Sequence, residues 1–430
     1  MEPKPFDPKP FDPKPGMRQA SVAGLMVYAS DDIEDFRPFW PASGEHSAAR
    51  RYVFQSADFL KTWCETIGRA RLTRLAFVGV FTACGQPVLL LPLGVETRLG
   101  LRMLTCLDGG VVDYNCPVLF PASQDLSDTV MASLWIAMRR LLPPVDLILF
   151  DKMPGEVDGF RNPLLALGAR PYSHSGYVTT LARLKQGKGR PQGKSKEEIK
   201  QAKSAEARDT SEKGRDDSKG GSLHLPFAQD TRRNLRRLGE MGTLSFRQAA
   251  TVEERTQFLE AMIRQKTRRY METRGVDGFD RPGYRAFFRL ATERFAEAGF
   301  LHLSAVTLDD KILATHWGYV AGSRFYYLMP SYEGGEWPRY SPGRLLLHWL
   351  LDGAAANGLE AFDQGIGDEA YKARYCDHVV ALLQVEAACT AKGWAYLALR
   401  RARRRLAAGP LQGLLRSIAR AGRRFARPAA

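Results

Sequence analysis

Apolar and polar residues follow two different periods along the chain, and each change of period marks a predicted element. In the first part, the apolar runs 72–81 (LTRLAFVGVF) and 87–96 (PVLLLPLGVE) flank the short segment ACGQ. This arrangement predicts two strands joined in a hairpin. Residues 128–142 (DTVMASLWIAMRRLL) have the 3.6-residue period of an amphipathic helix, and residues 145–154 (VDLILFDKMP) form an apolar run typical of a buried strand.

The second part of the chain has a different order of elements. Helices are predicted over 231–242, 252–275 and 281–299, with strand 244–249 after the first helix and with Gly275 and Gly299 as stop signals. Three strands then follow closely, over 301–309, 311–322 and 324–333, joined by tight turns. An apolar helix over 342–356, a strand over 359–367 and a last strand over 379–387 complete the pattern. Helices and antiparallel strands in this order indicate an α+β fold.

Composition divides the chain into five segments. Residues 1–23 contain a duplicated Pro-rich unit and are predicted to be disordered. Residues 24–184 and 223–393 are predicted to be two folded domains. Residues 185–222 are rich in Lys, Glu, Asp, Gly and Ser and contain no aromatic residue, which predicts a disordered linker. Residues 394–430 form an Arg-rich tail.

Positive charge is concentrated in that tail. The formal net charge is +15, and the eleven Lys and Arg residues that follow Glu386, with no Asp or Glu among them, supply +11 of it. Over 409–428, five apolar residues fall on one helical face and five arginines on the other, which is typical of a helix bound to an anionic membrane surface. Packing against the protein's own body, or against a partner helix, stays open. Nucleic acid other than tRNA is not expected as a partner.

The six cysteines have neither CxxC spacing nor a paired pattern, so we expect ordinary thiols in a reducing compartment and no metal site. The chain has no apolar run of about 18 residues and no signal-peptide pattern. A cytoplasmic protein, peripheral at the inner membrane if the tail binds there, is the expectation.

The start of the helix at 342 is unusual in its charge. Ser341 and Pro342 suit a helix N-terminus, but Arg344 occupies the first turn, where the helix dipole favours an acid. One interpretation is a phosphate or pyrophosphate site, since free amides at a helix start and a guanidinium both bind such anions. The other interpretation is an ordinary helix start with Arg344 in solvent.

The run from Arg324 through Tyr375 resembles the GNAT acyltransferase superfamily, and more narrowly its CelD-like branch, which is associated with cellulose biosynthesis. That branch is similar in architecture to the tandem-GNAT FemABX peptidyltransferases. The resemblance covers roughly residues 24–400 and is most specific over 311–375. It implies two GNAT-like halves, each a mixed, mostly antiparallel sheet flanked by helices. It also implies acyl-CoA (acetyl-CoA) as co-substrate and no metal.

The resemblance places the CoA pyrophosphate loop at residues 339–344. The family pattern is Q/R-x-x-G-x-G/A, whereas this segment reads RYSPGR, with one glycine and with Pro342 in place of an amide donor. Tyr340, Ser341, Gly343 and Arg344 are therefore the expected CoA-binding residues, with Arg344 replacing missing amides. A backbone amide on the preceding strand, 324–333, is expected to bind the carbonyl oxygen.

Three residues are candidates for catalysis. His316 has a suitable pKa range for a general base, and alternation places it on one strand face with Ala314, Gly318 and Val320. A core histidine is the open alternative. Tyr327 faces the expected cleft, although packing explains it equally well. Glu369 is the carboxylate available as a base.

Four further residues are candidates for substrate binding. Asp363 and Lys372 belong to the segment DQGIGDEAYK, typical of the family, and either contact the acceptor or form a buried ion pair that fixes the loop. Lys266 and Arg269 lie on the helix that borders the acceptor side in GNAT folds, unless they form a solvated basic face. Asp113, Tyr114 and Asn115 in the first half are expected to be structural or to lie between the halves.

Three functions fit these observations. The first is transfer of an acyl group from acyl-CoA to an amine or hydroxyl of a sugar or polysaccharide-linked acceptor, in envelope biosynthesis. The second is an aminoacyl-tRNA-dependent transferase of FemABX type. The third is a catalytically inert GNAT-like adaptor at the membrane.

Overall fold

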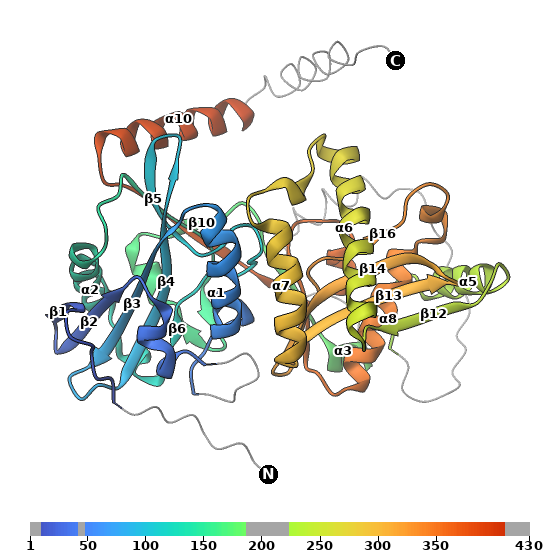
Figure 1. Ribbon diagram of the computed structural model, residues 1–430, viewed down its shortest axis with the longest axis horizontal. Coiled ribbons are helices and arrows are strands. Elements are labelled where there is room, and N and C mark those ends of the chain that lie inside the picture. The colour runs from blue at the N-terminus through green and yellow to red at the C-terminus, as the bar shows by residue number, and fades with distance from the viewer. Residues whose placement is uncertain (1–9, 42–47, 186–222, 409–430) are drawn as a thin grey trace.

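The computed structural model describes residues 10–41, 48–185 and 223–408. These residues form two lobes that lie side by side, each built on a β-sheet with helices against it (Figure 1). The sheets are mixed and mostly antiparallel, which confirms the predicted α+β class. The predicted linker and the amphipathic segment 409–428 lie outside the described residues, so both stay predictions.

The first sheet contains nine described strands in the order β1-β2-β3-β4-β5-β7-β19-β10, with β6 paired to β4. The strands are β1 (Arg18–Val22), β2 (Leu25–Ser30), β3 (Arg74–Thr82), β4 (Pro87–Arg98), β5 (Leu101–Cys106), β6 (Val118–Leu119), β7 (Leu147–Pro154), β10 (Arg170–Pro171) and β19 (Leu382–Ala388). The predicted hairpin is β3–β4, and its inward residues are almost fully buried.

The second sheet contains eight described strands in the order β12-β13-β14-β15-β17-β11-β18, with β16 paired to β14. The strands are β11 (Gly176–Thr180), β12 (Leu244–Gln248), β13 (Leu301–Leu308), β14 (Lys311–Ala321), β15 (Arg324–Tyr326), β16 (Ser331–Tyr332), β17 (Ala361–Ile366) and β18 (His378–Val380). A separate small hairpin joins β8 (Glu156–Val157) and β9 (Phe160–Arg161).

The described helices include the five predicted over 128–142, 231–242, 252–275, 281–299 and 342–356. The full set is α1 (Ala57–Trp63), α2 (Asp128–Leu141), α3 (Leu181–Lys185), α5 (Ala228–Gly239), α6 (Val252–Arg274), α7 (Tyr284–Glu297), α8 (Pro342–Ala356), α9 (Lys372–Tyr375) and α10 (Ala391–Ala408). In α6, Thr251 and Glu254 form a capping box, and Gly275 ends the helix in the left-handed conformation.

The two halves repeat one arrangement of elements. In the first half, β4 pairs successively with β5 and β6, helix α2 follows, and β7 then lies parallel to β5. In the second half, β14 pairs with β15 and β16, helix α8 follows, and β17 lies parallel to β15. The protein is therefore a tandem repeat of one α+β unit, and corresponding positions of the two units can be compared directly.

The sheets do not follow the order of the chain. Strand β11, which the sequence places at the end of the first region, pairs with β17 and β18 in the second sheet. Strand β19, from the end of the second region, pairs with β7 in the first sheet. Each half thus completes the other's sheet, and neither predicted domain contains all the strands of its own sheet.

The prediction of disorder over the whole of 1–23 is wrong for residues 10–22. Phe11 stacks on Phe81 with ring centroids 4.2 Å apart and contacts Phe39, and Arg18–Val22 is a strand. Burial of this aromatic ring offsets the cost of ordering a Pro-rich segment.

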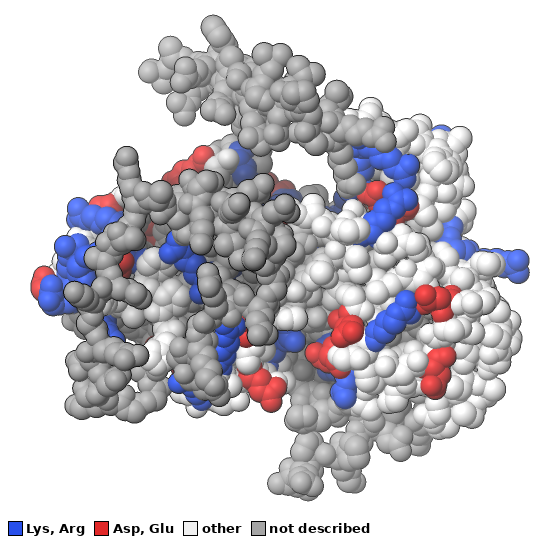
Figure 2. All heavy atoms as spheres, turned by 180° about the vertical axis from the view of Figure 1, so that it is seen from behind, with Lys and Arg blue, Asp and Glu red and all other residues white. Residues whose placement is uncertain are grey.

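Aromatic packing also joins the two halves. Phe59 of α1 contacts Phe287 and Phe295 of α7, with ring centroids 5.4 and 6.0 Å apart. Charged side chains of opposite sign lie near one another on the described surface of the face shown in Figure 2. The described surface on this face is therefore not uniformly basic.

Candidate functional site

The second sheet opens at one point between β15 and β17. These strands are parallel neighbours from Arg324–Ala361 to Tyr326–Asp363, and the amide of Tyr327 still donates to the Asp363 carbonyl. Beyond that bond, the chain continues as β16, which pairs only with β14. The sheet therefore splays after Tyr327, three residues before Pro330, where the sequence suggested the break.

A β-bulge lies at the same point. Between the pairs Tyr319–Tyr326 and Thr315–Ser331, β14 advances four residues and its partner five. The bulge sits opposite Gly318, where an added Cβ would be 2.1 Å from the Tyr326 carbonyl oxygen. Glycine is therefore needed at position 318 for this close approach.

The bulge leaves one amide available. Met329 donates to the Trp317 carbonyl and Tyr327 to the Asp363 carbonyl, whereas the Leu328 amide between them has no partner among the described residues. A free amide in a splayed sheet is a hydrogen-bond donor for a carbonyl oxygen that enters there.

Two lysines and one carboxylate gather beyond the end of β17. Lys372 is buried, pairs with Glu369 at 3.0 Å, and donates to the Ile366 carbonyl at 3.0 Å. Lys266 of α6 has no hydrogen-bond or ion-pair partner among the described residues. Burial lowers the pKa of Lys266 to about 8, nearby Glu369 opposes that shift, and Lys372 adds to it. The structure thus brings together Lys266, Glu369 and Lys372.

Of the two interpretations of Asp363 and Lys372, the ion pair between them is wrong, because each charged group has another partner. Asp363 is fully buried and pairs instead with Arg324 at 3.0 Å, while its Oδ1 accepts from the Tyr114 hydroxyl and the Gly365 amide, both at 2.8 Å. One of these partners, Tyr114, belongs to the first half, and Lys372 is not among them. Asp363 therefore fixes the interface between the halves.

Asp113 and Tyr114 confirm the expectation of a position between the halves. Asp113 accepts from the Ile366 amide at 3.3 Å, directly beside the lysine group. Burial raises the pKa of Asp113 to about 6, and Lys152 opposes the shift. Asn115 is structural, since its side chain donates to the Asp151 carbonyl within the first half.

His316 and Tyr327 lie in the core. Alternation along β14 is as predicted, but His316 is fully buried, and its ring stacks on Tyr327 with centroids 4.9 Å apart and 7° between planes. Burial holds the pKa of His316 well below its ordinary value and that of Tyr327 well above its own. Neither nitrogen of His316 makes a hydrogen bond of good geometry among the described residues, although the Tyr326 backbone lies close enough to oppose the lowering of the pKa. The geometry favours the interpretation of a neutral core histidine.

The start of α8 bears on one of the two interpretations of the sequence, that of Arg344 in solvent, and the phosphate site stays a prediction. Ser341 occupies the N-cap in the left-handed conformation (φ 52°) and makes no side-chain cap bond, and its amide closes the preceding 3-10 turn on the Pro338 carbonyl. Arg344 lies over the ring of Phe227 at 5.1 Å and is partly buried. Arg344 is therefore not free in solvent.

The other two residues of this loop have separate surroundings. Tyr340 packs beside the cluster around Trp337, and its carbonyl accepts from Asn234 at 3.0 Å. Gly343 faces the ring of Tyr332, which an added Cβ would approach to 3.3 Å. Only small groups fit between this helix start and β16.

In the first repeat, the corresponding helix start and lysine have partners within the protein. Ser127 caps α2 by accepting from the Val130 amide, and Asp128 supplies the acid in the first turn. At the end of β7, Lys152 pairs with Asp108 at 2.7 Å. Only in the second repeat, among the described residues, are the helix cap and a lysine without partners, which locates the candidate site there.

Arg269 does not join the site. Its guanidinium is exposed and lies 3.7 Å from Glu272, one turn along α6, so the interpretation of a solvated basic face holds for this residue. Sequence reasoning missed Arg324 and Leu328. Arg324 carries no motif, and the role of Leu328 comes from its amide, for which side-chain patterns give no signal.

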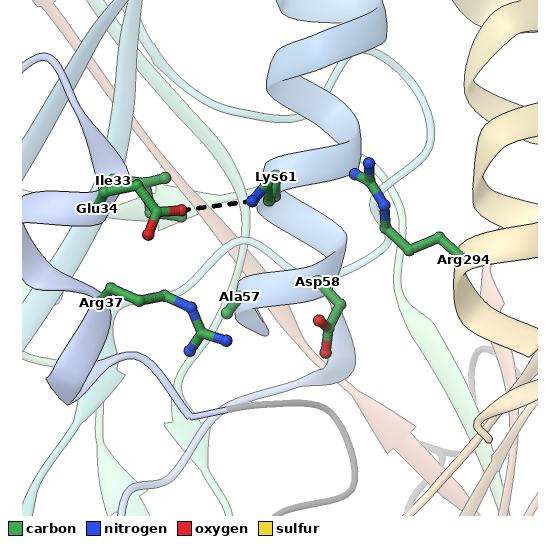
Figure 3. Close-up of a pocket in the computed structure, with 7 residues that line it drawn as sticks. All are labelled: Ile33, Glu34, Arg37, Ala57, Asp58, Lys61 and Arg294. Atoms are coloured by element: carbon green, nitrogen blue, oxygen red, sulfur yellow. Dashed lines mark ion pairs between the residues drawn. The ribbon is translucent and has the colours of Figure 1, made fainter. Parts of the chain in front are cut away.

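Two open clefts lie elsewhere. One, of about 260 Å³, is lined by Glu34, Arg37, Asp58 and Lys61 and by Arg294 of α7 (Figure 3). The other, of about 340 Å³, lies around Arg71, Glu96, Arg98 and Arg281. Neither contains a residue of the splay.

Neither a metal site nor a membrane span is found in the part of the chain that the structure describes. No cluster of three or more His, Cys, Asp or Glu suited to a metal occurs there, and no helix there is long and apolar enough to cross a bilayer.

Part of the second half is similar in sequence to a known protein family. Residues 227–373 match the model of the acetyltransferase (GNAT) domain, a match of about a third of the chain that includes α8, β17 and Lys372. The second half is thus similar to a GNAT acyltransferase domain. No curated protein sequence matches the chain significantly.

Several solved structures are similar in fold at low sequence identity. FemX has 11% identity and a TM-score of 0.48, covering 78% of this chain and 92% of its own. L-PGS from Bacillus licheniformis has 12% identity and a TM-score of 0.44, covering 80% and 96%. A tandem GNAT protein from the clavulanic acid biosynthesis pathway has 11% identity and a TM-score of 0.39, covering 74% and 84%.

Proposed function

We propose that the protein is an acyltransferase that moves an acyl group from acyl-CoA to an amine or hydroxyl acceptor at the splay of the second sheet. The observation that carries the proposal is the unpartnered Leu328 amide in the β-bulge, near the end of β17 that leads into the lysine group. The match of residues 227–373 to the GNAT acetyltransferase domain supports the same reaction class.

In this proposal, four residues take part in the acyl transfer. The acceptor nitrogen or oxygen attacks the thioester carbonyl, whose oxygen becomes negative and accepts from the Leu328 amide. The carbon–sulfur bond then breaks and CoA leaves as a thiolate. Glu369 is exposed and pairs with Lys372 beside the splay, so it takes the proton of the acceptor directly or through water. Lys266 and Lys372 stabilise negative charge on the donor or acceptor.

The CoA pyrophosphate would lie at the start of α8. Gly343 offers a helix amide there, and Ser341, Tyr340 and Arg344 form the walls. Arg344 and Arg374 both lie within about 5 Å of the Phe227 ring, which gathers cationic groups near this helix start. Asp363 has a supporting role, because it fixes the Gly365 turn beside the splay.

The acceptor and the pathway rest on the resemblance to the CelD-like branch. We propose a sugar or polysaccharide-linked acceptor in the cell envelope, and a cytoplasmic location peripheral to the inner membrane. No metal takes part in this scheme.

The test is thermal unfolding with acetyl-CoA and longer acyl-CoAs, with pyrophosphate and ATP as controls for the binding of polyanions. Ligand at about 100 times its Kd stabilises the folded state by about 2.7 kcal/mol, a shift of a few degrees in Tm. A shift with CoA thioesters alone, lost in Gly343→Val, supports the proposal. Equal shifts with the controls, or none, would overturn acyl-CoA as donor and favour the inert adaptor.

A second candidate is aminoacyl-tRNA-dependent transfer, which one surface supports. Helix α5 exposes Arg232 and Arg237, which have no ion-pair partner among the described residues, and its N-terminus follows Phe227 beside Arg344. Retention of radiolabelled aminoacyl-tRNA on a filter, lost in Arg232→Ala/Arg237→Ala, would favour this donor.

A further inference from the structure

Helix α10 presents an apolar face to solvent. One side of the helix packs on the first sheet through Leu397, which contacts the cluster of Leu101, Met103 and Leu147. The other side, opposite the body, carries only apolar residues over about three turns, and all are exposed: Ala391, Trp394, Ala395, Ala398, Leu399 and Ala402. Trp394 is 61% exposed and Leu399 is 59% exposed.

Basic residues border this apolar face. Lys392 and Arg403 are exposed at its margin and have no ion-pair partner among the described residues. The nearby acids are already engaged, since Glu386 pairs with Arg400 at 2.7 Å and Asp146 with Arg102 at 3.4 Å. The rim therefore has a net positive charge that complements an anionic surface.

Two loop tips of the first sheet add exposed leucines. The β4–β5 turn carries Leu99 next to the strand that supports α10, and Leu72 precedes β3 at the same end of the sheet. Leu99 is 92% and Leu72 is 89% exposed, and both have left-handed backbones, with φ of 53° and 54°. A turn of this kind favours Gly or Asn, so neither folding nor packing explains a leucine.

These features reach one edge of the molecule. Figure 1 shows α10 across the top of the first lobe, above β5, with the upper end of α6 reaching the same edge on the second lobe. That end of α6 carries Met271, 51% exposed, and Val276 follows it, 64% exposed.

We propose that this edge is a membrane-docking face, in which the outward face of α10 and the Leu99 and Leu72 tips enter the interface of an anionic bilayer. The apolar stripe and basic rim are those of a helix that lies in the plane of a membrane surface. The segment after residue 408 continues this charge pattern in sequence, with arginines and apolar residues and no acid. The proposal stands without the acyltransferase activity and does not depend on it.

The experiment is sedimentation of the full chain with sucrose-loaded vesicles of phosphatidylcholine, with and without about 30% phosphatidylglycerol to provide the negative surface potential of a membrane. The main variant is Trp394→Gln/Leu399→Gln, which leaves charge unchanged and suits a helix. Its matched control is Ile136→Gln, on the outer face of α2, where the isoleucine is 58% exposed. We expect the double variant to bind anionic vesicles about tenfold more weakly or worse, and the control to bind as the wild type.

Two further variants separate docking from folding. Leu99→Asn suits the left-handed turn, so we expect an equal or higher Tm together with weaker vesicle binding. Trp394→Phe keeps an apolar side chain and should bind, but should lose the fluorescence quenching that brominated lipids cause. Trp394 is the one tryptophan among the described residues that is mostly exposed.

Three results would overturn the proposal. The first is equal vesicle binding by wild type and Trp394→Gln/Leu399→Gln. If binding is then lost in Leu414→Gln/Leu415→Gln, docking belongs to the C-terminal segment alone. The second is a concentration-dependent dimer in light scattering that the α10 variant abolishes, which would make a second copy the occupant. The third is a Leu99→Asn protein that binds as well as the wild type.

Discussion

The hydroxyl of Tyr114 in the first half donates to Oδ1 of Asp363 in the second half over 2.8 Å, and both residues are fully buried. The same carboxylate pairs with Arg324 and accepts from the Gly365 amide, so one buried charge joins both halves at the candidate site.

Removing this hydroxyl tests how strongly the halves are joined. We expect Tyr114→Phe to lower the free energy of unfolding by about 1.5–3 kcal/mol, because a buried carboxylate loses a donor that water cannot replace. Chemical denaturation measures the loss. Tyr177→Phe is the matched control, since its hydroxyl donates to the exposed Asp368 at 3.1 Å, and it should cost less than about 1 kcal/mol. Equal losses would contradict the structural role of the Tyr114–Asp363 bond.

Asp113 predicts a pH dependence of stability. Its folded pKa of about 6 exceeds the unfolded value of about 3.9, so the folded state holds the proton more tightly. The stability that this group contributes is fully present below about pH 4 and is lost as pH rises through about 6, by up to about 3 kcal/mol. The difference between the denaturation curves of wild type and Asp113→Asn from pH 4 to 7 should show this slope. A difference that stays constant across that range would refute it.

Lys266 predicts a gain in stability from a loss of charge. Its folded pKa of about 8 lies below the unfolded value of about 10.4, so at pH 7 the folded state bears the cost of a poorly solvated ammonium group. We expect Lys266→Met to raise the free energy of unfolding at pH 7 by about 1–3 kcal/mol and to reduce acyl transfer by about a hundredfold or more. Release of CoA thiol measures the reaction.

Arg269→Met is the control for that prediction, because it removes a cation from the same helix at an exposed site. It should leave stability within about 0.5 kcal/mol of wild type and turnover nearly unchanged. Equal changes in stability and turnover in Lys266→Met and Arg269→Met would show that Lys266 has no role in the site.

The core position of His316 predicts that two substitutions there differ in their effect on stability. His316→Phe keeps a flat ring between Tyr327 and Phe325, and it removes two buried nitrogens that lack partners. We expect it to fold, to be as stable as wild type or more so, and to keep its activity. His316→Ala leaves a cavity and should cost about 2–4 kcal/mol. A folded His316→Phe protein without turnover would show that the histidine is the base after all.

Several features of this protein follow from local sequence alone. The 3.6-residue and two-residue periods located α2, α6, α8 and β14, and Gly275 marked the end of α6, because periodicity and caps act over a few residues. The polar cluster after β17 was also found from its motif. Lys266 and Lys372 were both candidates, and the structure places them together with Glu369.

Contacts between distant segments are what the tertiary structure decided. The exchange of β11 and β19 between the sheets, the pairing of Asp363 with Arg324 rather than Lys372, and the burial of His316 all depend on residues far apart in sequence. The free amide of Leu328 depends on the register between β14 and its two partners, which side-chain patterns do not record. Local sequence determines which side of a helix or strand is apolar. Only the assembled fold determines which apolar sides pack against each other, and whether one, such as the outward side of α10, stays exposed.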